Sequence, residues 1–141
     1  MDERTARLLA YVERNVDHFA AACTRCGKCF EACPLARYSG KLAGQAGGAV
    51  VTGILDLLQG RGDMPAAIEW ARMCCQSAQC VKACPEKLDA MLMVRLARIT
   101  ALGSTGRAPL MADAKRDPNF FRRINAFATL QLTDAEIAEW H

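Results

Sequence analysis

Eight cysteines constrain this chain more than any other feature of its 141 residues. They form two groups about forty residues apart, called here the first run and the second run, and none lies elsewhere. The first run contains Cys23, Cys26, Cys29 and Cys33, and the second contains Cys74, Cys75, Cys80 and Cys84. A disulfide-stapled secreted domain usually scatters its cysteines, and the N-terminal residues lack the pattern of a secretory signal peptide. The grouping therefore favours metal binding.

The first run has the spacing C-x2-C-x2-C-x3-C-P, which is typical of a [4Fe–4S] cluster. Three of its thiolates lie on one short loop, and Gly27 lets the backbone approach a sulfide without a Cβ clash. In two-cluster proteins the fourth cysteine, here Cys33 before Pro34, binds the other cluster. Zinc sites usually pair two C-x2-C knuckles. The run thus predicts an iron–sulfur cluster, with zinc and disulfides as alternatives.

The second run departs from this pattern, because Ser77 stands where a cysteine belongs and Cys75 is out of register. If each fourth cysteine crosses over, the expected ligands are Cys23, Cys26, Cys29 and Cys84 for the first cluster, and Cys33, Cys74 and Cys80 for the second. One iron of the second cluster then lacks an ordinary ligand. It is absent, leaving [3Fe–4S], or it is bound by a Ser77 alkoxide or by Cys75 after the loop distorts. We favour [3Fe–4S], with Cys75 as a small buried hydrophobic residue.

The two C…C-P runs, separated by a helical stretch, resemble the α-helical ferredoxin domain over roughly residues 20–100. That domain occurs in the small iron–sulfur subunit of heterodisulfide reductases and in iron–sulfur subunits of succinate dehydrogenase, fumarate reductase and glycolate or lactate oxidases. The chain is similar to the small heterodisulfide reductase subunit in size and in the position of Trp70. Its second run is instead similar to the [3Fe–4S] run of the succinate dehydrogenase subunit. The resemblance implies an all-α ferredoxin fold.

The resemblance also implies a function. We expect a non-catalytic electron-transfer subunit of a cytoplasmic heterodisulfide reductase-like complex, because no nucleophile–base pair or phosphate loop is present. The implied partners are a protein similar to the catalytic, CCG-motif subunit of heterodisulfide reductase and further redox subunits. A quinone-linked relay and an iron–sulfur or zinc regulatory module are the alternatives. The net charge of +3 is too diffuse to favour nucleic acid, and no stretch approaches the length of a membrane span.

Composition favours a mainly helical chain, because aromatic residues make up only 6% and the core must be aliphatic. The spacing of apolar residues then predicts where the helices lie. A stripe predicts an N-terminal helix of about 15 residues; it consists of Leu8, Leu9, Val12, Val16 and Phe19. Residues 36–48 are expected to be irregular or a weak helix. Further helices are expected over residues 50–59, from Pro65, and over 88–102. Residues 1–102 form the predicted ferredoxin domain, and 103–141 a linker and helical docking extension with a capping box at Thr133–Glu136.

Three basic side chains lie next to the cysteines and are candidates for tuning the clusters; they are Arg25, Lys28 and Lys82. Their positive charge would stabilise the more negative reduced state and raise the potential. Met91, Met93 and Met111 are expected to fill the core, because methionine packs well around irregular shapes.

Overall fold

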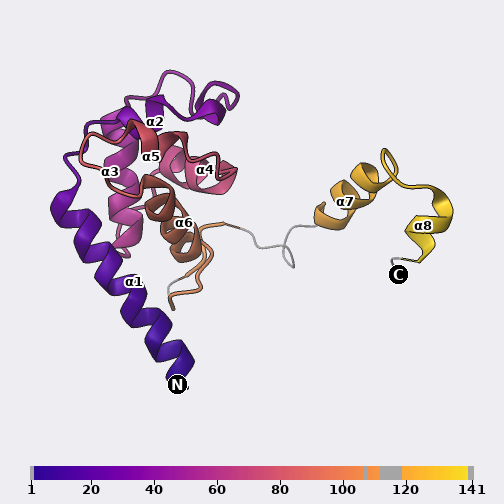
Figure 1. Ribbon diagram of the computed structural model, residues 1–141, viewed down its shortest axis with the longest axis horizontal. Coiled ribbons are helices and arrows are strands. Elements are labelled where there is room, and N and C mark those ends of the chain that lie inside the picture. The colour runs from indigo at the N-terminus through magenta and orange to yellow at the C-terminus, as the bar shows by residue number, and fades with distance from the viewer. Residues whose placement is uncertain (1, 107, 112–118, 140–141) are drawn as a thin grey trace. The chain divides into compact units, whose positions relative to one another are not determined.

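The computed structural model describes residues 2–106, 108–111 and 119–139 (Figure 1). Within these ranges the regular structure is helical and contains no strand, which confirms the predicted all-α fold class. The helices are α1 (Glu3–Ala22), α2 (Lys28–Glu31), the 3-10 helix η1 (Pro34–Arg37), α3 (Gly47–Leu58), α4 (Pro65–Met73), α5 (Gln79–Ala83), α6 (Ala90–Ala101), α7 (Phe120–Ala128) and α8 (Asp134–Ala138).

The chain divides into two compact units, and the first of them ends at Met111. The sequence predicts this boundary earlier, after Leu102. The later boundary has a physical reason, because the backbone N–H groups of Leu110 and Met111 donate to the carbonyl oxygen of Ala101 at 2.7 and 3.1 Å. These bonds hold the chain against the end of α6 and make it part of the first unit.

The first unit contains the same order of helices twice. In each half a helix leads into a cysteine run, a short helix of four or five residues follows, and a helix of 12 residues ends the half. The halves pack across each other, since α3 contacts α4 and α6, α1 contacts α6, and α2 contacts α5. Figure 1 shows α2 and α5 side by side at one end of this unit. The packing therefore brings the two cysteine runs together.

The core lies where α3, α4 and α6 meet. Helix α3 is apolar around most of its surface, and such a helix is stable only when it is enclosed. Its buried residues include Val50, Val51, Ile54, Leu55, Leu57 and Leu58. The neighbouring helices contribute Ala67, Trp70, Ala71, Met93, Val94, Leu96 and Ala97. The ring of Trp70 meets that of Phe30 edge-on, with centroids 5.2 Å apart, and so joins α4 to the one-turn helix α2.

Helix α1 is longer than the predicted 15 residues and extends over 20. It starts early because the Asp2 carboxylate accepts a hydrogen bond from the Thr5 N–H at 2.8 Å and caps the first turn. Of the predicted apolar stripe, Val12 and Phe19 are buried in the core, whereas Leu8 is 57% exposed. The part of α1 from Val12 onward thus packs on the rest of the first unit.

The segment between η1 and α3 is built from turns, in agreement with the irregular structure predicted there. It is fixed to α4 by the Ser39 hydroxyl, which donates to Glu69 at 3.3 Å. The buried Glu69 carboxylate also accepts two bonds from Arg72, at 2.8 and 3.0 Å. These bonds from Arg72 are the main reason that the pKa of Glu69 lies below its ordinary value, so the anchor stays ionised at neutral pH.

The second unit, within its described residues 119–139, contains α7 and α8. Helix α8 has the predicted capping box, in which Thr133 and Glu136 each accept a bond from the other's backbone N–H, at 2.8 Å for Thr133 N and 3.4 Å for Glu136 N. Phe121 is 69% exposed and Leu130 82% exposed. Asp117–Pro118, which the sequence predicts to cap the segment that contains Phe120, lies outside the described residues.

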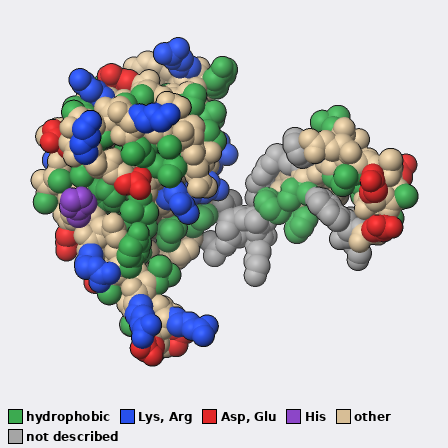
Figure 2. Space-filling model, viewed as in Figure 1, with side chains coloured by type: hydrophobic (Ala, Val, Ile, Leu, Met, Phe, Trp, Pro, Cys, Tyr) green, Lys and Arg blue, Asp and Glu red, His purple; other side chains and the backbone are tan. Residues whose placement is uncertain are grey.

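The surface of the first unit carries both signs of charge. On the face shown in Figure 2, Lys and Arg side chains are scattered among acidic and apolar ones rather than gathered in one patch. Among the helices that the structure describes, none combines the length and apolar character needed to cross a bilayer.

Substitutions at two glycines test why the first cysteine loop needs glycine at position 27. Gly27 and Gly44 both have left-handed backbones, with φ of 81° and 77°. A Cβ on Gly27 would lie 2.6 Å from the backbone of Gly47 and Gly48, whereas a Cβ on Gly44 would meet nothing within 4 Å. We expect Gly44→Ala to lower the free energy of unfolding by about 1–2 kcal/mol, and Gly27→Ala by about 2–5 kcal/mol. Unfolding followed by circular dichroism without oxygen measures both, and equal losses would contradict the close-approach explanation.

Candidate metal centres

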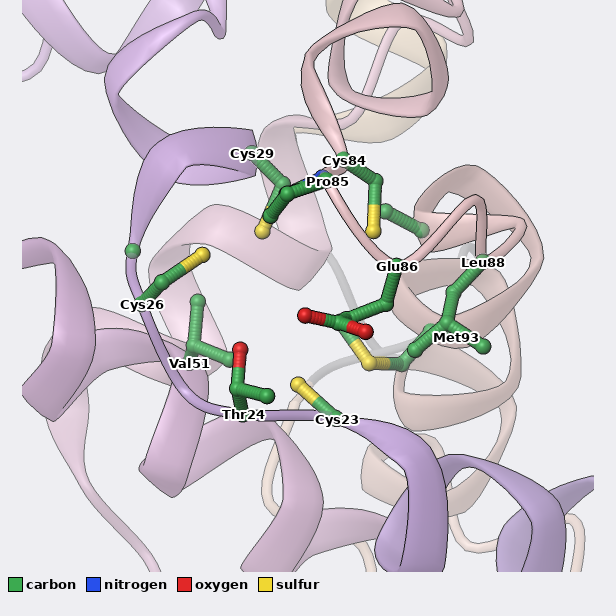
Figure 3. Close-up of a pocket in the computed structure, with 12 residues that line it drawn as sticks. Cys23, Thr24, Cys26, Cys29, Val51, Cys84, Pro85, Glu86, Leu88 and Met93 are labelled. Carbon is green, nitrogen blue, oxygen red and sulfur yellow. The ribbon is translucent and has the colours of Figure 1, made fainter.

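The first site is a cavity lined by four thiols, three from the first cysteine run and one from the second. Cys23 caps the end of α1, Cys26 lies in the loop, Cys29 is in α2, and Cys84 follows α5. Figure 3 shows their sulfur atoms pointing into one space. Cys29 is buried and Cys26 exposed, so the cavity reaches from the core to the surface. This is the grouping expected if the fourth cysteine of the second run crosses over.

The backbone of the first loop explains how three thiols face one space. Arg25 and Gly27 have left-handed backbones, with φ of 59° and 81°, whereas the residues on either side of them do not. Each left-handed residue turns the chain sharply, so the loop curls around the cavity. The carbonyl oxygen of Gly27 then accepts bonds from the N–H groups of Phe30 and Glu31, both at 3.0 Å, and starts α2.

The second site is a cavity that contains the remaining cysteines. Its walls include Cys33 from the first run, together with Cys74, Cys75, Ser77 and Cys80. Cys75 is exposed, so the expectation that it is a small buried hydrophobic residue is wrong. Both cavities have a volume of about 20 Å³, so the second is no smaller than the first. Cys33 of the first run thus lines the second cavity, and Cys84 of the second run lines the first cavity. That these thiols bind iron remains a prediction.

The two loops have the same backbone pattern. Gln76 and Ala78 have φ of 60° and 59°, and they occupy the places of Arg25 and Gly27 in the first loop. Ser77 therefore stands at the position of Cys26. Left-handed backbone costs a residue with a Cβ roughly 1–2 kcal/mol. The second loop keeps this costly shape although one of its cysteines is replaced, which fits a loop that still encloses a ligand.

Ionisation of the thiols reports which of them are neighbours. Burial raises the pKa of Cys29 to about 12, and the nearby Cys23 adds to the shift. Burial likewise raises the pKa of Cys80, with smaller contributions from Cys74 and Cys33. Cys80 also acts on Cys29, so the two cavities lie next to each other. Free thiols of this kind hold their protons at neutral pH and release them when a metal binds.

The donor sets fit an iron–sulfur cluster better than zinc. In the described ranges, no three His, Cys, Asp or Glu side chains converge closely enough to hold one metal ion. The thiols instead surround two cavities. Zinc needs its ligands around a single point at about 2.3 Å, whereas each iron of a cluster binds its own thiolate. Soft, closely grouped thiols around an enclosed space suit the polynuclear group.

The candidate tuning residues lie outside the cavity walls. Arg25, Lys28 and Lys82 are exposed. The guanidinium of Arg25 donates to the carbonyl oxygen of Cys23 at 3.3 Å, which places its charge against the first loop. Lys28 and Lys82 lie on the short helices α2 and α5, next to Cys29 and between Cys80 and Cys84. Any effect of these three charges on a cluster acts through solvent or backbone.

Three wall residues were not assigned to a site from the sequence. Glu86, two residues after Cys84, directs its carboxylate toward the first cavity in Figure 3. Met93 lines the first cavity and Met91 the second, so α6 contributes to both walls. The sequence predicts these methionines only as core-filling residues. Only the packing of α6 between the two sites gives them this position.

The comparison with known families agrees with this geometry. Residues 19–88 match the family model described as 4Fe-4S dicluster domain, and this range contains all eight cysteines. No curated protein and no solved structure matches the chain. Two adjacent thiol-lined cavities in a helical unit are what a domain with two such clusters requires. The match over residues 19–88 therefore supports an iron–sulfur protein of the ferredoxin-like kind.

Proposed function

We propose that this iron–sulfur protein is an electron-transfer subunit of a heterodisulfide reductase-like complex and passes electrons through two clusters to or from a catalytic partner. The exchange of Cys33 and Cys84 between the two cavities is the observation that carries the proposal. A shared set of loops holds the sites close together. When bound, the clusters would supply one-electron redox chemistry at potentials set by their ligands, hydrogen bonds and burial.

The ligand assignment follows from the two walls. We assign Cys23, Cys26, Cys29 and Cys84 to the first cluster, and Cys33, Cys74 and Cys80 to the second. Cys26 and Cys75 are exposed, whereas Cys29 is buried. Each site thus has one edge at the surface, where a donor or acceptor can approach, and the buried core excludes water from the path between them.

The expected partners are a protein similar to the catalytic, CCG-motif subunit of heterodisulfide reductase and further redox subunits. The second unit is a candidate surface for binding this partner, because Phe121 and Leu130 are large apolar residues that are exposed. Apolar anchors flanked by charge are typical of interfaces. In this proposal the first unit carries the electrons, and residues 112–141 hold the partner.

A quinone-linked relay is the second candidate function. A groove of about 310 Å³ lies beside the second site, and its walls include Cys33, Arg37 and Tyr38. Tyr38 is 82% exposed, and its ring offers a flat apolar surface next to a proposed ligand. Electron transfer from the reduced protein to a soluble quinone, weakened in Tyr38→Ala, would favour this function over the first.

The crossing of the fourth cysteines is tested by three single substitutions. We expect Cys84→Ala and Cys26→Ala to alter the same cluster signal in low-temperature EPR of oxygen-free protein, because both thiols line the first cavity. Cys80→Ala should alter the other signal. If Cys84→Ala changes the signal that Cys80→Ala changes, the assignment is wrong. Colourless, iron-poor protein that is fully folded would overturn the proposed function itself.

The charge of Lys28 is expected to raise the potential of the first cluster. Lys28→Glu should lower that potential, and Lys28→Gln should lower it less, because a nearby positive charge stabilises the reduced state. The difference should shrink at high salt, since the side chain is exposed and screened. A redox titration followed by EPR measures it, with Arg4→Glu at the far end of α1 as control. An effect of Arg4→Glu equal to that of Lys28→Glu would exclude a local role.

The two units are expected to separate in function. A chain that ends at Met111 should keep α1–α6 and the iron content of both clusters, because the first unit has its own core. It should lose association with the partner complex in co-purification. Association that survives this truncation would remove the docking role from the second unit.

A further inference from the structure

We propose that Cys75 supplies the fourth thiolate of the second site, which then holds a [4Fe–4S] cluster rather than the [3Fe–4S] cluster that its spacing favours. The proposal rests on the proposed function, because it needs two iron–sulfur clusters in this domain. Its basis is the equivalence of the two cysteine loops, one of which has an ordinary set of four cysteines.

The first step is the matching of positions between the loops. Cys23 and Cys74 are both C-caps, with ψ of 119° and 115°, and the left-handed residues follow at the same places in both loops. Ser77 therefore takes the place of Cys26, and Cys75 takes the place of Thr24. Because the backbones agree, the first loop shows where a side chain at position 75 points.

The second step concerns Thr24. Figure 3 shows the Thr24 side chain on the wall of the first cavity, between Cys23 and Cys26. A residue directly after the first cysteine of a run thus faces the same space as that cysteine. The second site repeats this arrangement, since Cys74 and Cys75 both line its cavity. Adjacent cysteines in this loop can serve one cluster because they reach different irons.

The third step concerns Ser77, which is the competing ligand. Ser77 also lines the second cavity and, like Cys75, is exposed, so exposure does not separate the two residues, but its hydroxyl oxygen lies closer to the backbone than a thiol sulfur would. Iron–sulfur clusters select soft thiolates, and a serine would have to lose its proton to compete. With a thiol on the same wall, Cys75 is the better donor for the fourth iron.

Iron content and EPR of oxygen-free reconstituted protein test this assignment. The full chain should hold about eight iron atoms, and Cys75→Ala about seven, with a new three-iron signal in the oxidised state. Ser77→Ala should keep about eight iron atoms and should not develop that signal. Placing Ser77→Cys in the Cys75→Ala background should restore the lost iron, because it recreates the ligand position of Cys26. Unchanged helical spectra and an unchanged first-cluster signal show that the variants are folded.

Three results would overturn the proposal. The first is an unsubstituted chain that holds about seven iron atoms. The second is a Cys75→Ala variant that holds as much iron as the unsubstituted chain. The third is loss of the fourth iron in Ser77→Ala and not in Cys75→Ala. All three leave the first cluster intact and so leave the proposed function standing. Loss of both clusters from folded, unsubstituted protein would instead remove the proposed function and this inference together.

Discussion

The exchange of Cys33 and Cys84 between the two halves is the constraint on which the first unit depends. Each cavity takes its last thiol from the other cysteine run. This exchange requires α2 and α5 to lie side by side, and it requires α6 to lie between the sites with Met91 on one wall and Met93 on the other. Helix packing therefore decides which thiols stand together as candidate ligands, as is usual where ligands come from distant parts of a chain.

The two halves share a plan but differ in detail, and the differences have local causes. The first loop presses against the start of α3, where only glycine fits at position 27. The second loop has Ala78 at the equivalent place, which accepts a left-handed backbone at a cost of roughly 1–2 kcal/mol. The first half also carries a longer segment between its short helix and α3, which Ser39 and Glu69 fix to α4. The two halves thus agree more closely in their cysteine loops than in the connections that follow them.

Much of the fold and of the site followed from local signals. Cysteine spacing predicted clusters of the iron–sulfur type, and apolar periodicity located the helices. Helix α1 is longer than the predicted 15 residues and α6 starts after the predicted residue 88, because Asp2 and Asp89 cap these helices where periodicity alone could not place a boundary. The end of the first unit differed as well, since two backbone hydrogen bonds to Ala101 decide it. Glu86 carried no signal in the sequence that distinguished it from a surface carboxylate.

The sequence by itself determined the chemistry of this protein, because closely spaced thiols have few uses in a helical domain and each x2 or x3 spacing is a short-range property of the chain. The tertiary structure decided which thiols share a cavity and which neighbours stand beside them. Cys84 lies far from Cys23 along the chain and lines the same wall only because α3, α4 and α6 pack as they do. The positions of Thr24 and Cys75 were likewise decided by how two loops curl around a space, a property that no spacing records.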